Sequence, residues 1–436
     1  MQTRFSDAQR RQPMIAEADD ILRKCVHCGF CTATCPTFVL TGDERDSPRG
    51  RIWMIRDMLE AGTPAPAATG YHLDRCLTCL SCMTTCPSGV DYAHLVDAGR
   101  QYVNETRPRA YTDWLLRRLL VRLVPFPRRM RLALTLSLLA VPFVRLLPSR
   151  LRAMVESRPR GLPKHDPVGD EDAVLSPTLP VRGRVILLQG CAQRVIEPEI
   201  NAATIRLLNR LGVEVVVRVA AGCCGGLAHH SGETEVAEAM MKQTIRDWAA
   251  TARQTDVDAI VINTSGCGTT IKDYGHYFAA DKAMAEDAAL VSDLAMDISE
   301  YLDHLGLEGV DPAIAAGMSV AYHSACSLQH GQKLREIPKN LLRQAGFSVR
   351  EITDSHLCCG SAGIYNILQP ELAGQLKTRK LASINAAGAE LVAAGNIGCI
   401  NQLKDADAPV LHTVQLLDWA TGGPAPKSIE RLATKH

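Results

Sequence analysis

The second half of the chain alternates between short apolar runs and longer stretches with apolar residues at helical spacing. Runs such as 185–188 and 213–217 are typical of strands buried on both faces. Between such runs we expect helices at residues 200–211, 234–252, 339–345 and 370–386. Because strands that alternate with helices form parallel sheets covered on both faces, the pattern predicts an α/β architecture.

Cysteines follow these expected strands in a pattern that occurs twice. The two sets are Cys191, Cys223, Cys224 and Cys267, and Cys326, Cys358, Cys359 and Cys399. Their offsets are 135 residues for the first position and the vicinal pair, and 132 for the last. Loops at the carboxyl ends of parallel strands meet at one edge of a sheet. We therefore predict two duplicated α/β Cys-Cys-Gly domains, over residues 181–310 and 311–436, each with four thiols on one rim.

Gly225 and Gly360 follow the two vicinal cysteine pairs. Adjacent cysteines can face one site only if the backbone turns sharply, which glycine permits. Buried core thiols behave as small hydrophobes, but that role does not explain a doubled vicinal pair. The eight thiols are candidates to bind one or two further iron-sulfur clusters, to bind zinc, or to cycle between dithiol and disulfide. The residues leave these alternatives open.

The first 110 residues contain the motif C-x2-C-x2-C-x3-C-P twice. This is the bacterial ferredoxin spacing for two 4Fe-4S clusters, in which the fourth cysteine of each motif binds the other cluster. Zinc needs only four ligands and does not explain the doubled motif. The predicted ligand sets are Cys25, Cys28, Cys31 and Cys86 for one cluster, and Cys76, Cys79, Cys82 and Cys35 for the other. We expect an N-terminal α-helical ferredoxin-like two-cluster domain over residues 1–110, so that the whole chain combines α+β and α/β parts.

Composition and charge limit the classes of function. A chain of 436 residues with 46% hydrophobic residues predicts two or three domains. Lys and Arg number 48 against 47 Asp and Glu, and this net charge of +1 gives no reason to expect a nucleic-acid partner. The charged N-terminus is not followed by an apolar core, so we expect no secretory signal and a cytoplasmic location. Sixteen cysteines in a reducing compartment indicate metal or redox chemistry, not a disulfide framework.

Residues 111–156 form a basic, leucine-rich region. Residues 114–150 contain eight arginines and no acidic residue, and the apolar run 132–144 is too short to span a bilayer. Arginine with leucine and aromatic residues at helical spacing predicts amphipathic helices on an anionic membrane surface, here the inner membrane. A hairpin packed on a partner subunit is the alternative. Residues 157–180 are rich in Pro, Gly and Asp, as is typical of an extended linker.

From residue 21 to 419 the chain resembles the iron-sulfur subunits of bacterial glycolate oxidases. The likeness lies in the order of the motifs and in residues 47–52, 322–326, 329–331 and 358–363. The wider group includes the C subunit of anaerobic glycerol-3-phosphate dehydrogenase, lactate-utilisation iron-sulfur proteins and subunits of heterodisulfide reductase. In the heterodisulfide reductase motif the last cysteine begins a Cys-x-x-Cys pair, whereas Cys267 and Cys399 have no second cysteine. We therefore do not expect a five-cysteine noncubane cluster.

The resemblance implies an electron-transfer subunit of a multisubunit glycolate dehydrogenase. The chain has no nucleotide-binding Gly-x-Gly-x-x-Gly after a strand and no nucleophile elbow, so we expect no substrate oxidation by this chain alone. The implied partners are an FAD-containing glycolate-oxidising subunit, a second flavin-type subunit, and quinone or another acceptor. Glycolate would become glyoxylate, with D-lactate as a second substrate. The alternatives are a subunit of a glycerol-3-phosphate or lactate dehydrogenase, and a thiol-disulfide reductase.

A few charged or polar residues near the cysteines have two interpretations. A cluster with four thiolates is anionic, so Arg49 and Arg51 could raise its reduction potential, or could simply open a helix. His27 is expected to be a polar residue beside a cluster. His323 and His330 flank the first cysteine of the second repeat, where a structural role is favoured over metal binding.

Overall fold

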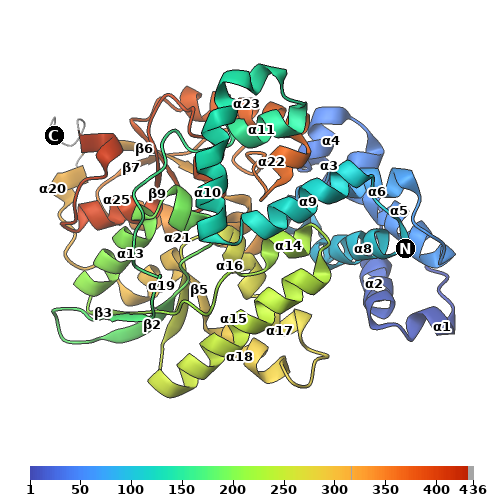
Figure 1. Ribbon diagram of the computed structural model, residues 1–436, viewed down its shortest axis with the longest axis horizontal. Coiled ribbons are helices and arrows are strands. Elements are labelled where there is room, and N and C mark those ends of the chain that lie inside the picture. Colours follow the sequence, from blue (N-terminus) through green and yellow to red (C-terminus); the bar gives the residue numbers. More distant parts are fainter. Residues whose placement is uncertain (316, 431–436) are drawn as a thin grey trace.

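The computed structural model of the chain describes residues 1–315 and 317–430. Figure 1 shows a helical N-terminal domain at one end of the molecule, beside two α/β units formed by the rest of the chain. Helices of the basic region run between these parts, which brings all the cysteine-bearing segments into one body.

The N-terminal domain consists of helices packed around the cysteine loops. Its longer helices are α2 (Pro13–Lys24), α5 (Pro48–Ala61), α6 (Ala67–Asp74) and α8 (Tyr92–Thr106). Leu22, Ile55 and Leu95 lie in their shared core. The short helices that begin inside or directly after the motifs are α3 (Phe30–Ala33), α4 (Pro36–Thr41) and α7 (Ser81–Thr85). Pro36 suits the first turn of α4, where its missing N–H would have no partner.

The first Cys-Cys-Gly repeat contains a five-stranded sheet in the order β1-β3-β2-β4-β5. Its strands are β1 (Ala173–Leu175), β2 (Gly183–Leu187), β3 (Val213–Val217), β4 (Ala259–Ile262) and β5 (Ala295–Asp297). All pairs are parallel except β1 with β3. Strand β1 lies within residues 157–180, so part of the expected linker belongs to the sheet. Its short apolar run covers an edge of β3 that would otherwise be open.

The second repeat has a parallel four-stranded sheet in the order β7-β6-β8-β9. Its strands are β6 (Ser319–His323), β7 (Ser348–Arg350), β8 (Leu391–Ala394) and β9 (Val410–His412). This order matches β3-β2-β4-β5 of the first repeat. The predicted helices are α13 (Glu199–Arg210), α15 (Thr234–Thr255), α21 (Ile337–Gln344) and α23 (Pro370–Ala386). The predicted fold class, a helical ferredoxin-like domain followed by two α/β repeats, is confirmed.

The two repeats pack through equivalent helices. Helix α13 packs against α25 (Thr413–Ala420), and its counterpart α21 packs against α19 (Ile298–Leu305). This reciprocity is that of a pseudo-twofold axis. Arg206 and Arg210 on α13 both pair with the buried carboxylate of Asp418 on α25. The repeats therefore share one apolar core and are held in a fixed orientation.

The basic region lies against both repeats. It comprises α9 (Tyr111–Leu123), α10 (Pro127–Ser137), the 3-10 helix η2 (Leu138–Leu146) and α11 (Ser149–Glu156). Leu116 and Leu120 of α9 pack on Ile364 and Leu368 of the second repeat, and Leu227 of the first repeat joins this cluster. Within the described residues, no helix has the length and apolar character needed to cross a bilayer.

Arginines of this region do not all face solvent. Arg117 is buried, and its guanidinium lies 2.8 Å from Asp113 and 3.1 Å from Asp74. Arg150 also pairs with Asp113, at 2.7 Å. Arg117 therefore fixes α9 to the N-terminal domain and is not available to a lipid headgroup. Sequence reasoning missed this role because both acidic partners lie outside residues 114–150.

A charged histidine joins the N-terminal domain to the first repeat. His94 on α8 lies 2.7 Å from Asp91 and 2.8 Å from Asp273, and its ring stacks on His276 with centroids 3.8 Å apart. Burial disfavours the charged ring, but the hydrogen bonds that it donates to Asp273 and Asp91 outweigh this effect and raise the pKa of His94 to about 10. The imidazolium is thus the stable form at neutral pH.

We predict that His94→Gln removes a stabilising contribution that depends on pH. The folded-state pKa lies above the ordinary value of 6.5, so the contribution is complete below pH 6.5 and declines as the pH rises toward 10. Thermal unfolding of the cluster-loaded protein should show a lower Tm for the variant at pH 6, by roughly 1 °C per kcal/mol lost for a chain of this length, and a smaller difference at pH 10. His304→Gln, at an exposed site on α19, is the control. A Tm difference independent of pH would contradict the assignment.

Candidate metal centres

The first cysteine cavity lies near the surface of the N-terminal domain. It is lined by the four cysteines predicted for one cluster, with Cys82 at its inner side: Cys25, Cys28, Cys31, Cys86 and Cys82. Cys28 is exposed, whereas Cys25 and Cys82 are buried. We call this cavity I. One side is therefore open to solvent and the other faces the protein interior.

A second cavity, cavity II, is enclosed by the other predicted set. Its cysteines are Cys35, Cys76, Cys79 and Cys82, and all four are buried. The fourth cysteine of each motif thus lies with the three cysteines of the other motif. Cys82 lines both cavities, so only a thin layer of protein separates them.

The two motifs repeat an unusual backbone conformation. His27 and Gly29 have φ of 56° and 81° in the first motif, and Thr78 and Leu80 have φ of 50° and 60° in the second. Left-handed conformations cost non-glycine residues about 1–2 kcal/mol each. Such strain is typical of functional sites held by their surroundings. Here it turns the chain around each cavity so that successive cysteines face inward.

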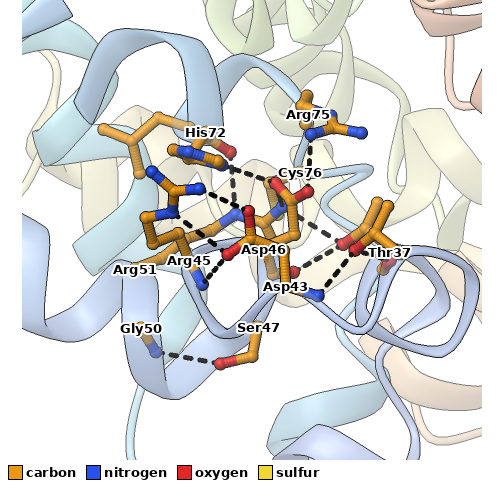
Figure 2. A network of polar contacts seen from close by, with 12 residues as sticks. Thr37, Asp43, Arg45, Asp46, Ser47, Gly50, Arg51, His72, Arg75 and Cys76 are labelled. Atoms are coloured by element: carbon orange, nitrogen blue, oxygen red, sulfur yellow. Dashed lines mark hydrogen bonds and ion pairs between the residues drawn. The ribbon is translucent and has the colours of Figure 1, made fainter. Parts of the chain in front are cut away.

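A buried carboxylate holds two arginines beside cavity II, as Figure 2 shows. Asp46 is fully buried and lies 2.6 Å from Arg75, 2.8 Å from Nδ1 of His72 and 3.5 Å from Arg51. Arg51 is also buried, and its Nη1 lies 3.9 Å from Sγ of Cys35. The network brings positive charge to the cavity wall. Sequence reasoning did not identify Asp46 or Arg75, because neither lies in a recognisable motif.

Arg49 has the corresponding position at cavity I. It lines the cavity, and its Nε donates to Glu44 at 2.7 Å. A Cβ on Gly29 would lie only 2.5 Å from Nη1 of Arg49, so the loop is closely packed on this guanidinium. The two arginines of the 47–52 segment therefore lie at different cavities, at the start of the same helix α5.

The cysteines of each Cys-Cys-Gly repeat converge as the strand pattern predicts. In the second repeat, Sγ of Cys326 lies 3.8 Å from Sγ of Cys358, and Sγ of Cys359 lies 3.5 Å from Sγ of Cys399. Gly360 follows with φ of 87°, and a Cβ there would lie 2.7 Å from the carbonyl oxygen of Ala373. Only glycine fits this turn.

In the first repeat, Sγ of Cys191 lies 3.7 Å from Sγ of Cys223, and Cys224 lies between Cys223 and Cys267. Cys267 belongs to α16 (Ser265–Ile271), which packs on the π-helical turn η3 (Ser327–Gly331) that follows Cys326. The two cysteine rims are therefore neighbours.

The two candidate histidines of the second repeat have different environments. His330 is bonded on both sides, with Nδ1 2.8 Å from Oγ1 of Thr84 and Nε2 donating to the carbonyl of His356 at 3.0 Å. This ring links the N-terminal domain to the second repeat, in agreement with a structural role. His323 is buried, and neither ring nitrogen has a hydrogen-bond partner among the described residues.

The second repeat also borders cavity II. Cys79 and Cys358 belong to one apolar cluster with Leu77 and Tyr365, and Cys326 packs against it. The hydroxyl of Tyr365 donates to the carbonyl of Arg75 at 3.1 Å. Cavity I, cavity II and the second cysteine rim therefore form a continuous series.

The buried thiols favour their protonated form without metal. Burial raises the pKa of Cys79 and Cys82 well above the ordinary value, and raises the pKa of Cys31 to about 11. Thiolates are the forms that bind metal, so binding must displace these protons. The cavities thus have the sulfur donor atoms that iron-sulfur clusters require. Once these thiols have lost their protons, the iron ions would supply the positive charge that offsets the buried thiolates.

Comparison with known proteins agrees with this geometry. A 4Fe-4S dicluster domain profile matches residues 24–90, and a cysteine-rich domain profile matches residues 185–272 and 320–404. The glycolate oxidase iron-sulfur subunit of Escherichia coli (strain K12) is 41% identical over 96% of this chain and 99% of its own length. The chain belongs to the family of glycolate oxidase iron-sulfur subunits. The resemblance inferred from the motifs is therefore confirmed.

Other similar proteins extend the comparison. The probable glycolate oxidase iron-sulfur subunit of Bacillus subtilis (strain 168) is 31% identical over 88% of each chain. Lactate utilization protein A of the same organism is 26% identical over 54% of this chain and 99% of its own length. A hypothetical protein from Helicobacter pylori has a similar fold, with a TM-score of 0.56 at 9% identity over 96% of this chain and 74% of its own.

We predict that Arg49→Gln lowers the reduction potential of the cluster at cavity I. Removing a cation beside an anionic cluster disfavours its reduction, by up to about 59 mV if the one-electron equilibrium shifts tenfold. Redox titration followed by electron paramagnetic resonance would measure the shift. Arg45→Gln is the control, because Arg45 is exposed and pairs with Asp43 at 2.8 Å. An unchanged or higher potential in Arg49→Gln would contradict the prediction.

Proposed function

We propose that this chain carries single electrons within a glycolate-oxidising complex. The proposal is supported by the near full-length similarity to glycolate oxidase iron-sulfur subunits, together with two adjacent cysteine cavities. Iron-sulfur clusters transfer single electrons, whereas accepting a hydride from a hydroxy acid requires a cofactor such as flavin. The proposed partners are an FAD-containing subunit that oxidises glycolate to glyoxylate, and a second flavin-type subunit.

The proposed clusters are two 4Fe-4S groups with crossed ligation. Each cavity is lined by three cysteines of one motif and the fourth cysteine of the other, which is the observation that supports this assignment. When bound, the clusters would accept and release one electron each. Arg49, Arg51 and Arg75 would offset their negative charge.

Electrons would enter at cavity I and leave through the second repeat. Cavity I has an exposed cysteine and the exposed Val26 in its lining. The exposed Phe30 lies between its lining residues Gly29 and Cys31, and the exposed Trp53 donates to the lining residue His27, so that an apolar surface suited to a flavin subunit adjoins the cavity. All four cysteines of cavity II are buried, and the cavity borders the second cysteine rim. The Cys-Cys-Gly cysteines would hold further iron-sulfur groups or zinc, and the final acceptor would be quinone or another electron acceptor.

D-lactate is a second candidate substrate for the complex. The similarity to proteins called lactate utilization protein A covers about half of this chain and nearly all of theirs. The hydroxy acid would contact the flavin subunit and not this chain, so both substrates use the same electron path here.

We also propose that the basic region attaches the chain to an anionic membrane surface. Twelve of the 22 exposed large apolar side chains of the described residues belong to residues 111–151, which concentrates them on one region. Arg118, Arg122, Arg128 and Arg129 are exposed there as well. Each arginine near an anionic leaflet contributes about 1 kcal/mol, and inserted apolar side chains add to this.

A Cys35→Ser variant tests the electron path and the crossed ligation together. We expect glycolate to reduce both clusters of the wild-type complex, purified without oxygen and with about eight irons in the N-terminal domain. In the variant, the cluster of Cys76, Cys79 and Cys82 should be damaged, while glycolate still reduces the other and electron delivery to quinone falls.

The outcomes of this test are separable. Failure of glycolate to reduce either wild-type cluster would contradict the proposed function. Loss of the Cys25 cluster alone, with the other intact, would show that the ligation is not crossed. Electron paramagnetic resonance identifies which cluster remains.

A second variant tests membrane attachment. Leu139, Phe143 and Leu146 are 60–82% exposed, and their joint replacement by glutamine should release the chain from anionic vesicles, with at least a tenfold loss of binding. Leu179→Gln with Val181→Gln, two exposed apolar sites outside the region, is the control. Vesicle sedimentation of the cluster-loaded chain measures binding. Unchanged sedimentation of the triple variant would favour a partner subunit as the occupant of this surface.

A further inference from the structure

His323 is a buried imidazole without a hydrogen-bond partner at the second cysteine rim. It ends strand β6, is 1% exposed, and both of its ring nitrogens are unpaired among the described residues. An unsatisfied buried polar group costs about 1–3 kcal/mol. In the neutral ring one nitrogen carries no proton and can serve as a metal ligand. A metal beside the ring would satisfy one of these nitrogens.

The neighbours of this ring are sulfur atoms. One ring nitrogen of His323, Sγ of Cys359 and Sγ of Cys399 all lie within 4.8 Å of one another. The Sγ atoms of Cys359 and Cys399 are 3.5 Å apart, and those of Cys326 and Cys358 are 3.8 Å apart. Metal–sulfur bonds of about 2.3 Å in a tetrahedral site place ligand sulfurs roughly 3.8 Å apart. The spacing thus suits donors that share one metal ion.

The first repeat lacks this imidazole. Val320 of β6 pairs with Leu391 as Val185 of β2 pairs with Ala259, so the two sheets have the same register. His323 therefore corresponds to Leu188, which is buried. The first rim has four thiols and an apolar neighbour at the position where the second rim has a fifth donor.

A buried cation also distinguishes the second rim. Lys380 on α23 is 2% exposed, its Nζ donates to the carbonyl of Asp354 at 2.7 Å, and its charge interacts with Cys358 and Cys359. In the first repeat, the corresponding part of α15 contains the neutral Thr244 and Ile245. The second rim thus has a buried amine near its sulfurs that the first rim lacks. Lys380 lies four residues after the buried Leu376 and therefore on the same face of α23. A lysine at this apolar spacing was the sequence signal for a buried cation.

We propose that His323 is a ligand of a mixed thiolate–imidazole metal centre in the second repeat. Cys359 and Cys399 would bind the metal with it, and Cys326 and Cys358 would supply further thiolates. Cysteine and histidine are the ligands preferred by zinc, and both also bind iron. The first repeat would hold no such mixed centre. The inference rests on the proposed function for the presence of metal at the Cys-Cys-Gly cysteines and for the place of this centre after cavity II, whereas the role of His323 as a ligand rests on the geometry above.

If the metal is iron, the imidazole has a further consequence. Replacing thiolate ligands by histidine raises the reduction potential of an iron-sulfur centre, because a neutral ligand stabilises the oxidised state less. The second rim would then receive electrons more readily than the all-cysteine clusters of cavities I and II. With zinc, the same ligands would form a structural centre that fixes the wall of cavity II.

Metal analysis of the full chain, purified without oxygen, tests the ligand assignment. We compare the wild type, His323→Leu, which copies the first repeat, His323→Cys, which keeps a metal-binding donor, and the control His412→Asn. His412 is a buried histidine on the neighbouring strand β9 whose Nδ1 accepts the Val414 N–H at 3.1 Å, and asparagine is also a favourable helix N-cap. Iron, zinc and sulfide are counted, and X-ray absorption reports the ligands.

We expect metal in the wild type beyond the eight irons assigned to the N-terminal clusters. This additional metal should be lost, or bound at least tenfold more weakly, in His323→Leu, and retained in His323→Cys and His412→Asn. X-ray absorption should show a nitrogen ligand in the wild type and its loss in His323→Cys. The metal that is counted decides between iron and zinc.

Two results would overturn the proposal. One is a wild type with eight irons and no further metal, and the other is a His323→Leu variant that keeps the additional metal with an unchanged spectrum. Misfolding is excluded separately, because His323→Leu removes an unpaired buried group and should leave the Tm of the metal-free chain equal or higher. Reduction of the two N-terminal clusters by glycolate in the complex that contains the same variant shows whether the proposed function holds independently.

Discussion

The structure depends on one electrostatic constraint, which is that a thiolate removed from water is unfavourable unless positive charge lies beside it. A buried anion is tolerated only beside positive charge, whether this comes from a metal or from a side chain. Ten of the sixteen cysteines are buried, and no disulfide joins them in the described residues. Arg51 and Lys380 are themselves buried beside cysteines, where they are held by Asp46 and by a backbone carbonyl. The helices that deliver these cations, α5 and α23, are therefore as much part of the sites as the cysteine loops.

The features that could be predicted from the sequence are those that depend on residues close together along the chain. The cysteine spacing predicted the two motifs, and the alternation of apolar runs with helical stretches predicted the parallel sheets, including a helix at 370–386. Features that depend on distant partners could not be predicted. Asp46 belongs to no recognisable sequence motif. Arg117 belongs to a series of arginines that the sequence pattern places in solvent, and its partner Asp74 is distant in the sequence. Strand β1 was missed because a short edge strand in a Pro- and Gly-rich segment leaves no periodic signal.

The duplication separates what the backbone requires from what each site does. Both repeats keep the strand order, the vicinal cysteines and a glycine that no side chain could replace. They differ in the groups around the sulfurs, with Leu188 in one and His323 in the other. Such differences leave the backbone unchanged, since both side chains are buried at equivalent positions at the end of a strand. A duplicated scaffold can therefore acquire two different centres by substitutions at single positions.

Helix α9 also sets the distance between the second repeat and any surface that contacts the outer side of this helix. Its inner side contacts Ile364 and Leu368 of the second repeat, while Trp114, Leu115 and Leu119 on the same helix are exposed. A helix with its side chains is about 10–12 Å across. With the outer side of α9 resting on lipid, the second repeat would lie one helix thickness from the bilayer. The thickness of a single helix would then set how closely an acceptor dissolved in that bilayer could approach the surface of the second repeat.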